Sequence, residues 1–138
     1  METEKKIQLF VLHRYFIWSD RMRVHFDNAI RNKEKLDHGS FQIETFLYMS
    51  YWYGGLYVLI EGWKELELSD QTVNSLIESP NVDLLRRYRN GTFHFQKDYY
   101  DKRFMDFLSE GENCVVWVRQ LREAFSDYFL KNLPKLEK

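Results

Sequence analysis

The sequence predicts an all-α protein, a bundle of four long helices and one short helix. Apolar residues recur at alternating steps of three and four in several long segments, which is the period of one helical face. No stretch keeps a period of two for long, and the Asn-Gly pair at Asn90 is flanked by a helical pattern. Only two prolines and six glycines occur in 138 residues, so little in the composition interrupts long helices.

The first helix is predicted in the N-terminal segment and is followed by a break at "DHGS", Asp37 to Ser40. The residues that share one face of this helix are Val11, Tyr15, Trp18, Met22, His25 and Ala29. His25 lies on this apolar stripe, so we expect a core or interface residue there.

The second helix repeats this rhythm at Phe46, Met49, Tyr53, Leu56, Ile60 and Trp63. Its other faces are apolar too, which is typical of a helix buried on nearly all sides. The uncharged run between Glu44 and Glu61 has 16 residues, fewer than the ~20 that a membrane-spanning helix needs. Gly54 and Gly55 weaken the helix by roughly 1 kcal/mol each. They indicate either the close approach of another helix or a kink.

Three further helices complete the bundle. Ser69 is the predicted N-cap of a short helix through Glu78. Ser79 followed by Pro80 predicts the start of a third long helix. The last long helix follows "SEGEN" and stops near Pro134. Its apolar stripe is Cys114, Val118, Leu121, Phe125 and Tyr128.

Composition sets the class of protein. A chain of 138 residues with 44% apolar and 17% aromatic residues is large and apolar enough for one folded domain, residues 1–138. The formal charge of −1 gives no overall field toward nucleic acid or membrane, so any polyanion must be attracted by a local patch. The single cysteine, Cys114, excludes an internal disulfide and fits a reducing cytosol. The N-terminus "METEKKIQLF" lacks the features of a secretory signal, so we expect a cytoplasmic protein.

The stretch "RRYRNGTFHF" on the third long helix carries the candidate chemistry. Asn90 and His94 are four residues apart, which predicts that they project from the same face. Arg89 lies five residues before His94, roughly 140° around the helix. A second copy of the helix would have to supply the missing partner. Gly91 removes a side chain where a substrate or a second backbone needs room.

The spacing R-N-x-x-x-H in "RNGTFH" resembles the signature of the HEPN superfamily. The resemblance implies a small helical bundle with the motif on a late helix. It also implies a metal-independent ribonuclease, working without a cofactor as a homodimer in which both motifs line one cleft. Arg89, Asn90 and His94 carry over as the motif positions. Related proteins act as toxins or defence components, so the resemblance further implies an antitoxin-like protein partner, often a small nucleotidyltransferase.

These residue types suit RNA cleavage. A histidine can remove the proton of a 2′-hydroxyl near neutral pH, and that oxygen then attacks the adjacent phosphorus. A planar, permanently charged arginine can stabilise the phosphorane. The expected products are a 2′,3′-cyclic phosphate and a 5′-hydroxyl. Asn90 would orient the imidazole or a phosphate oxygen.

Positive charge is concentrated around the motif. Between Arg86 and Arg103 only Asp98 and Asp101 oppose six cations, and we expect five of these to contact RNA: Arg86, Arg87, Lys97, Lys102 and Arg103. The cations alternate with Tyr88, Phe93, Phe95, Tyr99 and Tyr100, whose rings could stack unpaired bases or could equally belong to the core.

Less specific interpretations stay open beside the ribonuclease. Arg89 and His94 could be ordinary surface residues, and Arg86 and Arg87 could pair with carboxylates of neighbouring helices. The histidines show no metal-ligand spacing, and Cys114 fits packing. The alternative function is a non-catalytic HEPN-like module that binds RNA, a nucleotide or a protein. A ribonuclease needs Arg89 and His94 exposed in a shared cleft, whereas the module predicts that one of them is buried or held by structural hydrogen bonds.

Overall fold

The computed structural model describes residues 2–110 and 113–133, and within them it contains helices and no strand. The predicted all-α class is confirmed. The helices are α1 (Glu2–Arg31), the short 3₁₀ helix η1 (Lys33–Lys35), α2 (His38–Glu65), α3 (Gln71–Leu76), α4 (Asn81–Phe93), α5 (Lys102–Glu110) and α6 (Cys114–Asn132). No helix among the described residues is long and apolar enough to cross a membrane.

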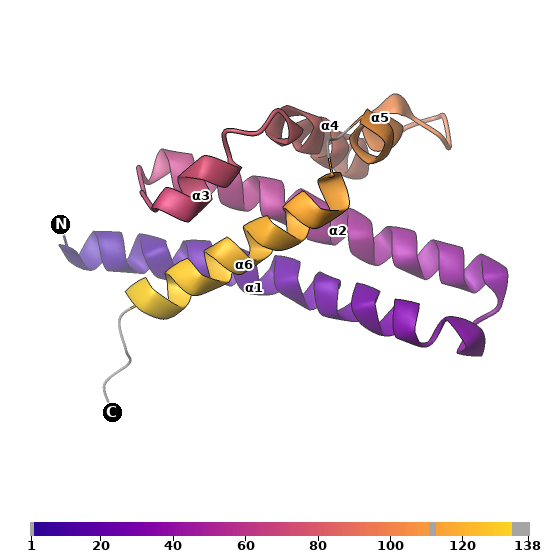
Figure 1. Ribbon diagram of the computed structural model, residues 1–138, viewed down its shortest axis with the longest axis horizontal. Coiled ribbons are helices and arrows are strands. Elements are labelled where there is room, and N and C mark those ends of the chain that lie inside the picture. The colour runs from indigo at the N-terminus through magenta and orange to yellow at the C-terminus, as the bar shows by residue number, and fades with distance from the viewer. Residues whose placement is uncertain (1, 111–112, 134–138) are drawn as a thin grey trace.

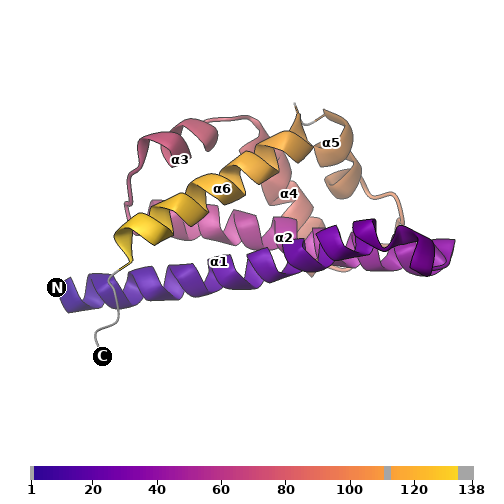
Figure 2. The same cartoon turned by 60° about the horizontal axis from the view of Figure 1, so that its bottom comes forward.

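Helices α1 and α2 form a long antiparallel hairpin, and the shorter helices gather on one side of it (Figures 1 and 2). Helix α6 crosses over the hairpin and packs with most of its predicted stripe inward. Cys114, Val118, Leu121 and Phe125 are buried, whereas Tyr128 is half-buried and its neighbour Phe129 is buried instead. The core lies between these two layers. Pro134, the predicted stop of α6, lies outside the described residues, and the helix ends at Asn132.

The hairpin depends on a close approach at Gly55. A Cβ atom added there would lie only 2.8 Å from Cβ of Ser19 on α1. The Ser19 hydroxyl, itself buried, donates a 2.8 Å hydrogen bond to the Trp52 carbonyl of α2. The close-approach interpretation of Gly55 is therefore confirmed, because a side chain at this position would push the two helices apart.

The apolar stripe predicted for α1 is mostly on the outside. Its core face is offset by one residue and contains Leu12 and Phe16. Trp18, in contrast, is 55% exposed.

The second helix also differs from the prediction, because its N-terminal half has exposed apolar residues on one side. We call the exposed set Val11, Tyr15, Trp18, Tyr51 and Phe93 the outer hairpin face.

The predicted third long helix is two helices. Helix α4 ends at Phe93, and a connection leads to α5, where the carboxylate of Asp101 accepts the backbone N–H of Arg103. Gly91 allows the two helices to touch, since a Cβ there would lie 3.1 Å from the ring of Phe104. The room at Gly91 is thus taken by the side chains of Arg103 and Phe104 of α5.

Two predicted caps are shifted by one residue. Asp70, and not Ser69, caps α3 by accepting the N–H of Val73. Pro80 precedes the first residue of α4 instead of occupying it, and the Ser79 hydroxyl accepts the N–H of Asn81. The carboxylate of Asp70 and the hydroxyl of Ser79 both satisfy helix-terminal N–H groups that have no partner within their helix.

Charged side chains join α1 to α6 across the sequence. Asp20 accepts hydrogen bonds from Arg23 and Arg122, and Asp27 accepts them from Arg23 and Arg119. Burial alone would raise the pKa of Asp20, but the bonds from its two arginines outweigh it and lower that pKa. The bond from Arg119 does the same for the pKa of Asp27. The charged forms of both carboxylates therefore stabilise the fold.

Candidate functional site

Arg89 lies one turn before the end of α4 and is held by α2. Its Nη1 donates to Oε1 of Glu61 at 3.2 Å, and its Nε donates to Oδ1 of Asn90 at 3.0 Å. The guanidinium also lies 4.9 Å from the centre of the Tyr57 ring, within the range of a cation–π contact. Arg89 is consequently oriented before any ligand arrives, and Asn90 helps to orient it.

His94 is the C-cap of α4 and has extended backbone angles. Its N–H still donates to the Asn90 carbonyl at 3.0 Å. His94 is therefore the residue directly after the helix on which the sequence placed it, and its shared face with Asn90 stays a prediction. The imidazole is exposed and has no side-chain hydrogen bond within the described part of the chain.

A single chain keeps the two key groups apart. Arg89 contacts Tyr57 and Glu61 of α2, whereas His94 lines a cavity with Ile43 and Leu47 of the same helix. The ten positions between Leu47 and Tyr57 correspond to about 15 Å along a helix. The structure therefore joins Arg89 to Asn90 by a hydrogen bond, and in the described residues it shows no hydrogen bond between either side chain and that of His94.

The cavity beside His94, the His94 cavity, has a volume of about 450 Å³. Helix α2, the end of α4 and the following connection surround it. Its lining residues are Gln42, Ile43, Phe46, Leu47, Gly91, Thr92, His94, Phe95, Gln96, Asp98, Tyr99 and Phe104. Volumes of this size are typical of small-molecule sites.

The charge patch is smaller than its sequence indicates. Arg86 pairs with Asp83 at 2.8 Å, Arg87 pairs with Asp106 at 2.9 Å, and Arg103 lies 3.4 Å from Asp101. Asp83 and Asp106 lie just outside residues 86–103, the segment in which the charges were counted, so they did not enter that count.

Lys97 and Lys102 are exposed and form no ion pair among the residues described. They are the cations with most freedom to meet a phosphate.

The aromatic residues of the motif region divide between core and surface. Tyr88 is fully buried and hydrogen-bonds to the Ser50 hydroxyl at 3.2 Å. Phe93, Phe95, Tyr99 and Tyr100 are exposed. The core interpretation is thus confirmed for Tyr88, and base stacking by the four exposed rings stays a prediction.

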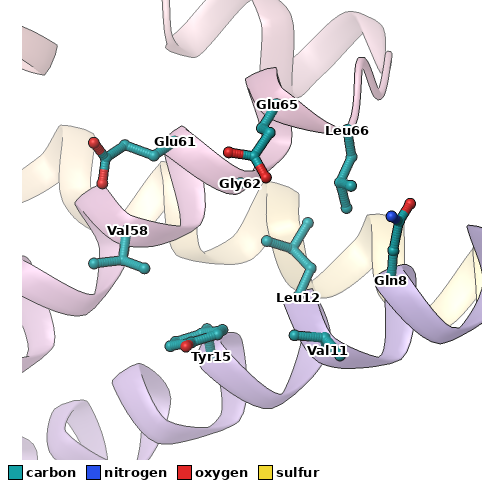
Figure 3. Close-up of a pocket in the computed structure, with 9 residues that line it drawn as sticks. All are labelled: Gln8, Val11, Leu12, Tyr15, Val58, Glu61, Gly62, Glu65 and Leu66. Carbon is teal, nitrogen blue, oxygen red and sulfur yellow. The ribbon is translucent and has the colours of Figure 1, made fainter.

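A groove on the outer hairpin face begins beside Arg89. Figure 3 shows Glu61 and Glu65 of α2 along the edge of a cavity of about 460 Å³ that Val11 and Tyr15 of α1 line from below. A second cavity, of about 490 Å³, continues it past Trp18, Tyr51 and Phe93. The two share Tyr15 and Val58, so the groove is continuous.

The α2 partners of Arg89 were missed in the sequence. Glu61 and Tyr57 lie about 30 residues before the motif, and no local pattern links them to it. Only the packing of α4 on α2 brings them to the guanidinium. The sequence signals that did exist, the R-N-x-x-x-H spacing and the alternating cations, mark α4 and the connection after it.

The remaining titratable candidates have structural surroundings. His25 is exposed, not in the core, and stacks on Tyr48 at 5.2 Å between ring centres. Burial raises the pKa of the Cys114 thiol, in agreement with a packing role. No group of three or more His, Cys, Asp or Glu residues suited to a metal ion occurs in residues 2–110 and 113–133.

Fold and site together define a small all-α protein with a polar motif at the end of its fourth α-helix. No protein-family model, no curated protein and no solved structure matches the chain. Its function is therefore argued from its own residues.

Proposed function

We propose that this protein is a metal-independent endoribonuclease of HEPN type that acts as a homodimer. The observation that carries the proposal is the exposed imidazole of His94, which has no side-chain partner in the described residues and borders a cavity five residues after an arginine. An exposed imidazole beside a cavity can reach a substrate as a general base.

The proposed reaction needs only groups of the chain and of the RNA. His94 accepts the proton of a 2′-hydroxyl, and the resulting oxygen attacks the adjacent phosphorus. The bond from phosphorus to the 5′-oxygen breaks, that oxygen takes up a proton from water, and His94 gives its proton to the hydroxide that remains. Arg89 stabilises the negative charge that develops on the phosphorane oxygens. The nucleophile lies within the substrate, so the scheme does not require a metal ion.

A homodimer supplies what one chain lacks. Arg89 is held against Tyr57 and Glu61, whereas His94 lines a cavity with Ile43 and Leu47, so an arginine of one copy and a histidine of the other are proposed to form each site. The outer hairpin face reaches the motif region at two places. Glu61, which lines its first cavity, is hydrogen-bonded to Arg89, and Phe93, near the end of α4, lines its second cavity. A second copy that packs on this face would therefore bury apolar surface and would also lie close to Arg89 of the first copy.

The experiment is cleavage of single-stranded RNA in excess EDTA, with DNA of the same sequence as control. RNA should be cut to products with a 2′,3′-cyclic phosphate, and DNA should stay intact. One 2′-deoxy nucleotide at the cleavage site should block that site alone. Cleavage of DNA, or a requirement for Mg²⁺, would contradict the proposal.

The second candidate is a non-catalytic HEPN-like module that binds RNA, a nucleotide or a protein. It is favoured by the contacts of Arg89, which is already hydrogen-bonded to Glu61 and Asn90. RNA binding without cleavage in the same experiment would select it. A neutralising protein partner, as in toxin–antitoxin systems, belongs to the first candidate. Co-expression with a neighbouring nucleotidyltransferase would test it by relief of toxicity.

A further inference from the structure

Two exposed aromatic rings of the connection between α4 and α5 line the His94 cavity. Phe95 is 90% exposed and Tyr99 is 79% exposed, and both line the His94 cavity. Exposed aromatic surface is unfavourable in water. Such rings are therefore candidates for contact with a ligand that has a flat apolar face.

The opposite wall of the cavity is apolar as well. It includes residues of α2, where Ile43 is 70% exposed and Leu47 is also accessible, and Phe104 of α5. A flat ring that entered the cavity would lie between the aromatic rings of the connection and the aliphatic side chains of α2. This arrangement suits a planar heteroaromatic ligand.

The polar groups of the lining have unequal freedom. Gln96 donates to the His94 carbonyl and accepts from Arg103, and Asp98 accepts the N–H of Tyr100. These two side chains hold the connection in shape. The amide of Gln42, in contrast, makes no hydrogen bond within the described part of the chain, although it lies in the same lining. It offers a donor and an acceptor to the edge of a ligand.

We propose that the His94 cavity binds one nucleobase, stacked on Phe95 and Tyr99 and read at its edge by Gln42. Stacking on aromatic side chains plus an amide at the edge is the chemistry by which proteins hold unpaired bases. Lys97 and Lys102 flank the rings in the sequence and can meet the phosphates on either side. The inference deepens the proposed function, on which it rests for the identity of the ligand as RNA. The base in this cavity would bring its own ribose close to His94.

The test is binding of fluorescently labelled, 2′-O-methyl homopolymers of A, C, G and U, which the proposed reaction cannot cut. Phe95→Ala and Tyr99→Ala should each weaken binding by roughly 5- to 100-fold, the range that loss of one stacking contact gives. Tyr99→Phe keeps the ring and should bind like wild type. Leu130→Ala, which removes an exposed apolar side chain of α6 outside the cavity, is the matched control. Gln42→Ala should change the order of affinities among the four homopolymers.

A parallel titration with the four nucleoside monophosphates separates two sources of the base. Weak binding of monophosphates beside tight binding of homopolymers supports a base of RNA. Equal affinities would assign the cavity to a free nucleotide instead. Light scattering of Phe95→Ala is the further control, because a change of mass would show that the ring covers a protein interface and would overturn the proposal.

The inference and the proposed function fail differently. If wild type binds no homopolymer and no monophosphate, or if the two alanine variants bind as well as Leu130→Ala, the nucleobase site is wrong even where RNA is cleaved. If binding depends on the rings of Phe95 and Tyr99 and RNA stays uncut, the nucleobase site is supported and the proposed ribonuclease activity is wrong.

Discussion

At the scale of residues, the end of α4 decides which motif side chains are available. His94 leaves the helix with an extended backbone, and its imidazole makes no side-chain hydrogen bond in the described residues. Arg89 stays within the helix and is held by Glu61, Asn90 and Tyr57. The two residues should therefore respond differently to mutation.

His94→Ala should leave the melting temperature unchanged, because the imidazole supports no other group, and should lower the rate of RNA cleavage roughly 10²- to 10⁴-fold. Arg89→Ala should lower it roughly 10²- to 10³-fold. The double variant should be little worse than the poorer single variant, since the two act in one step. Initial rates and thermal unfolding of the same preparations measure both effects. Normal cleavage by both stable variants would remove the motif from the reaction.

Glu61 competes with any phosphate for Arg89. Glu61→Gln should tighten RNA binding about two- to fivefold, which corresponds to the modest free energy of an exposed ion pair. Glu65→Gln changes the same charge one turn further along α2, and no ion pair of Glu65 is found in the part of the chain described, so it is the matched control. Equal affinities of the two variants would show that the Arg89–Glu61 pair does not limit access.

At the scale of elements, α1 and α2 of the hairpin approach each other closely at Gly55. Gly55→Ala should destabilise the protein by about 1 to 3 kcal/mol through overpacking against Ser19. This value is the net change in the free energy of unfolding, after the roughly 1 kcal/mol that alanine gains over glycine in helix propensity. Gly54→Ala is the control, because an added Cβ there meets the far edge of the Phe93 ring, which is exposed. Urea denaturation should separate the two variants.

The pairing of α1 with α6 predicts a dependence on acid. Asp20 and Asp27 have lowered pKa values in the folded protein, so their stabilisation is fully present above the unfolded value of 3.8. It is lost as pH falls through their folded pKa values. The free energy of unfolding should therefore be flat between about pH 7 and pH 5 for these groups and should fall below about pH 4.

Arg122→Gln removes one of the two arginines that bind Asp20 and should reduce this fall. It should also cost about 1 to 3 kcal/mol near neutral pH, the range for hydrogen bonds to charged groups. Denaturation midpoints across the pH range provide the test. An unchanged slope in Arg122→Gln would assign the acid sensitivity to other carboxylates.

Periodicity in the sequence predicted some elements well and others only in part. The stripe of α6 was correct because a single apolar face leaves one choice for the core. Helix α1 has two apolar faces, and the pattern alone could not decide between Leu12 with Phe16 and Tyr15 with Trp18. The division of the third long helix was missed although Asp101 has the character of an N-cap. The ion pair of Arg89 with Glu61 could not be predicted at all, because it depends on how α4 packs on α2.

At the scale of the whole molecule, the outer hairpin face is proposed to join two copies. Glu61 and Glu65 lie toward one end of its groove, and Arg21 lies in the other cavity. A two-fold axis between the ends would pair opposite charges twice, which is the self-complementarity of an isologous interface.

Light scattering at micromolar concentration should give about twice the chain mass. Trp18→Glu should halve it, because the change removes a large apolar side chain from the face and the desolvation of a carboxylate is costly even beside Arg21. Leu130→Glu, on α6 and outside the face, should leave the mass unchanged. Monomeric wild-type protein would exclude a site shared between two copies.

The two apolar faces of the hairpin also bear on how the chain reaches its native state. The contacts within α1–α2 are close in sequence compared with those to α6, where Asp20 and Arg122 are 102 residues apart. Local contacts form faster than distant ones. A newly formed hairpin therefore exposes apolar surface on both sides before α6 arrives, and an encounter with a second hairpin competes with completion of the fold. Rapid dilution from denaturant should therefore give a yield of native protein that falls as the final protein concentration rises. Each chain has to pack α6 on the hairpin before it meets a second chain.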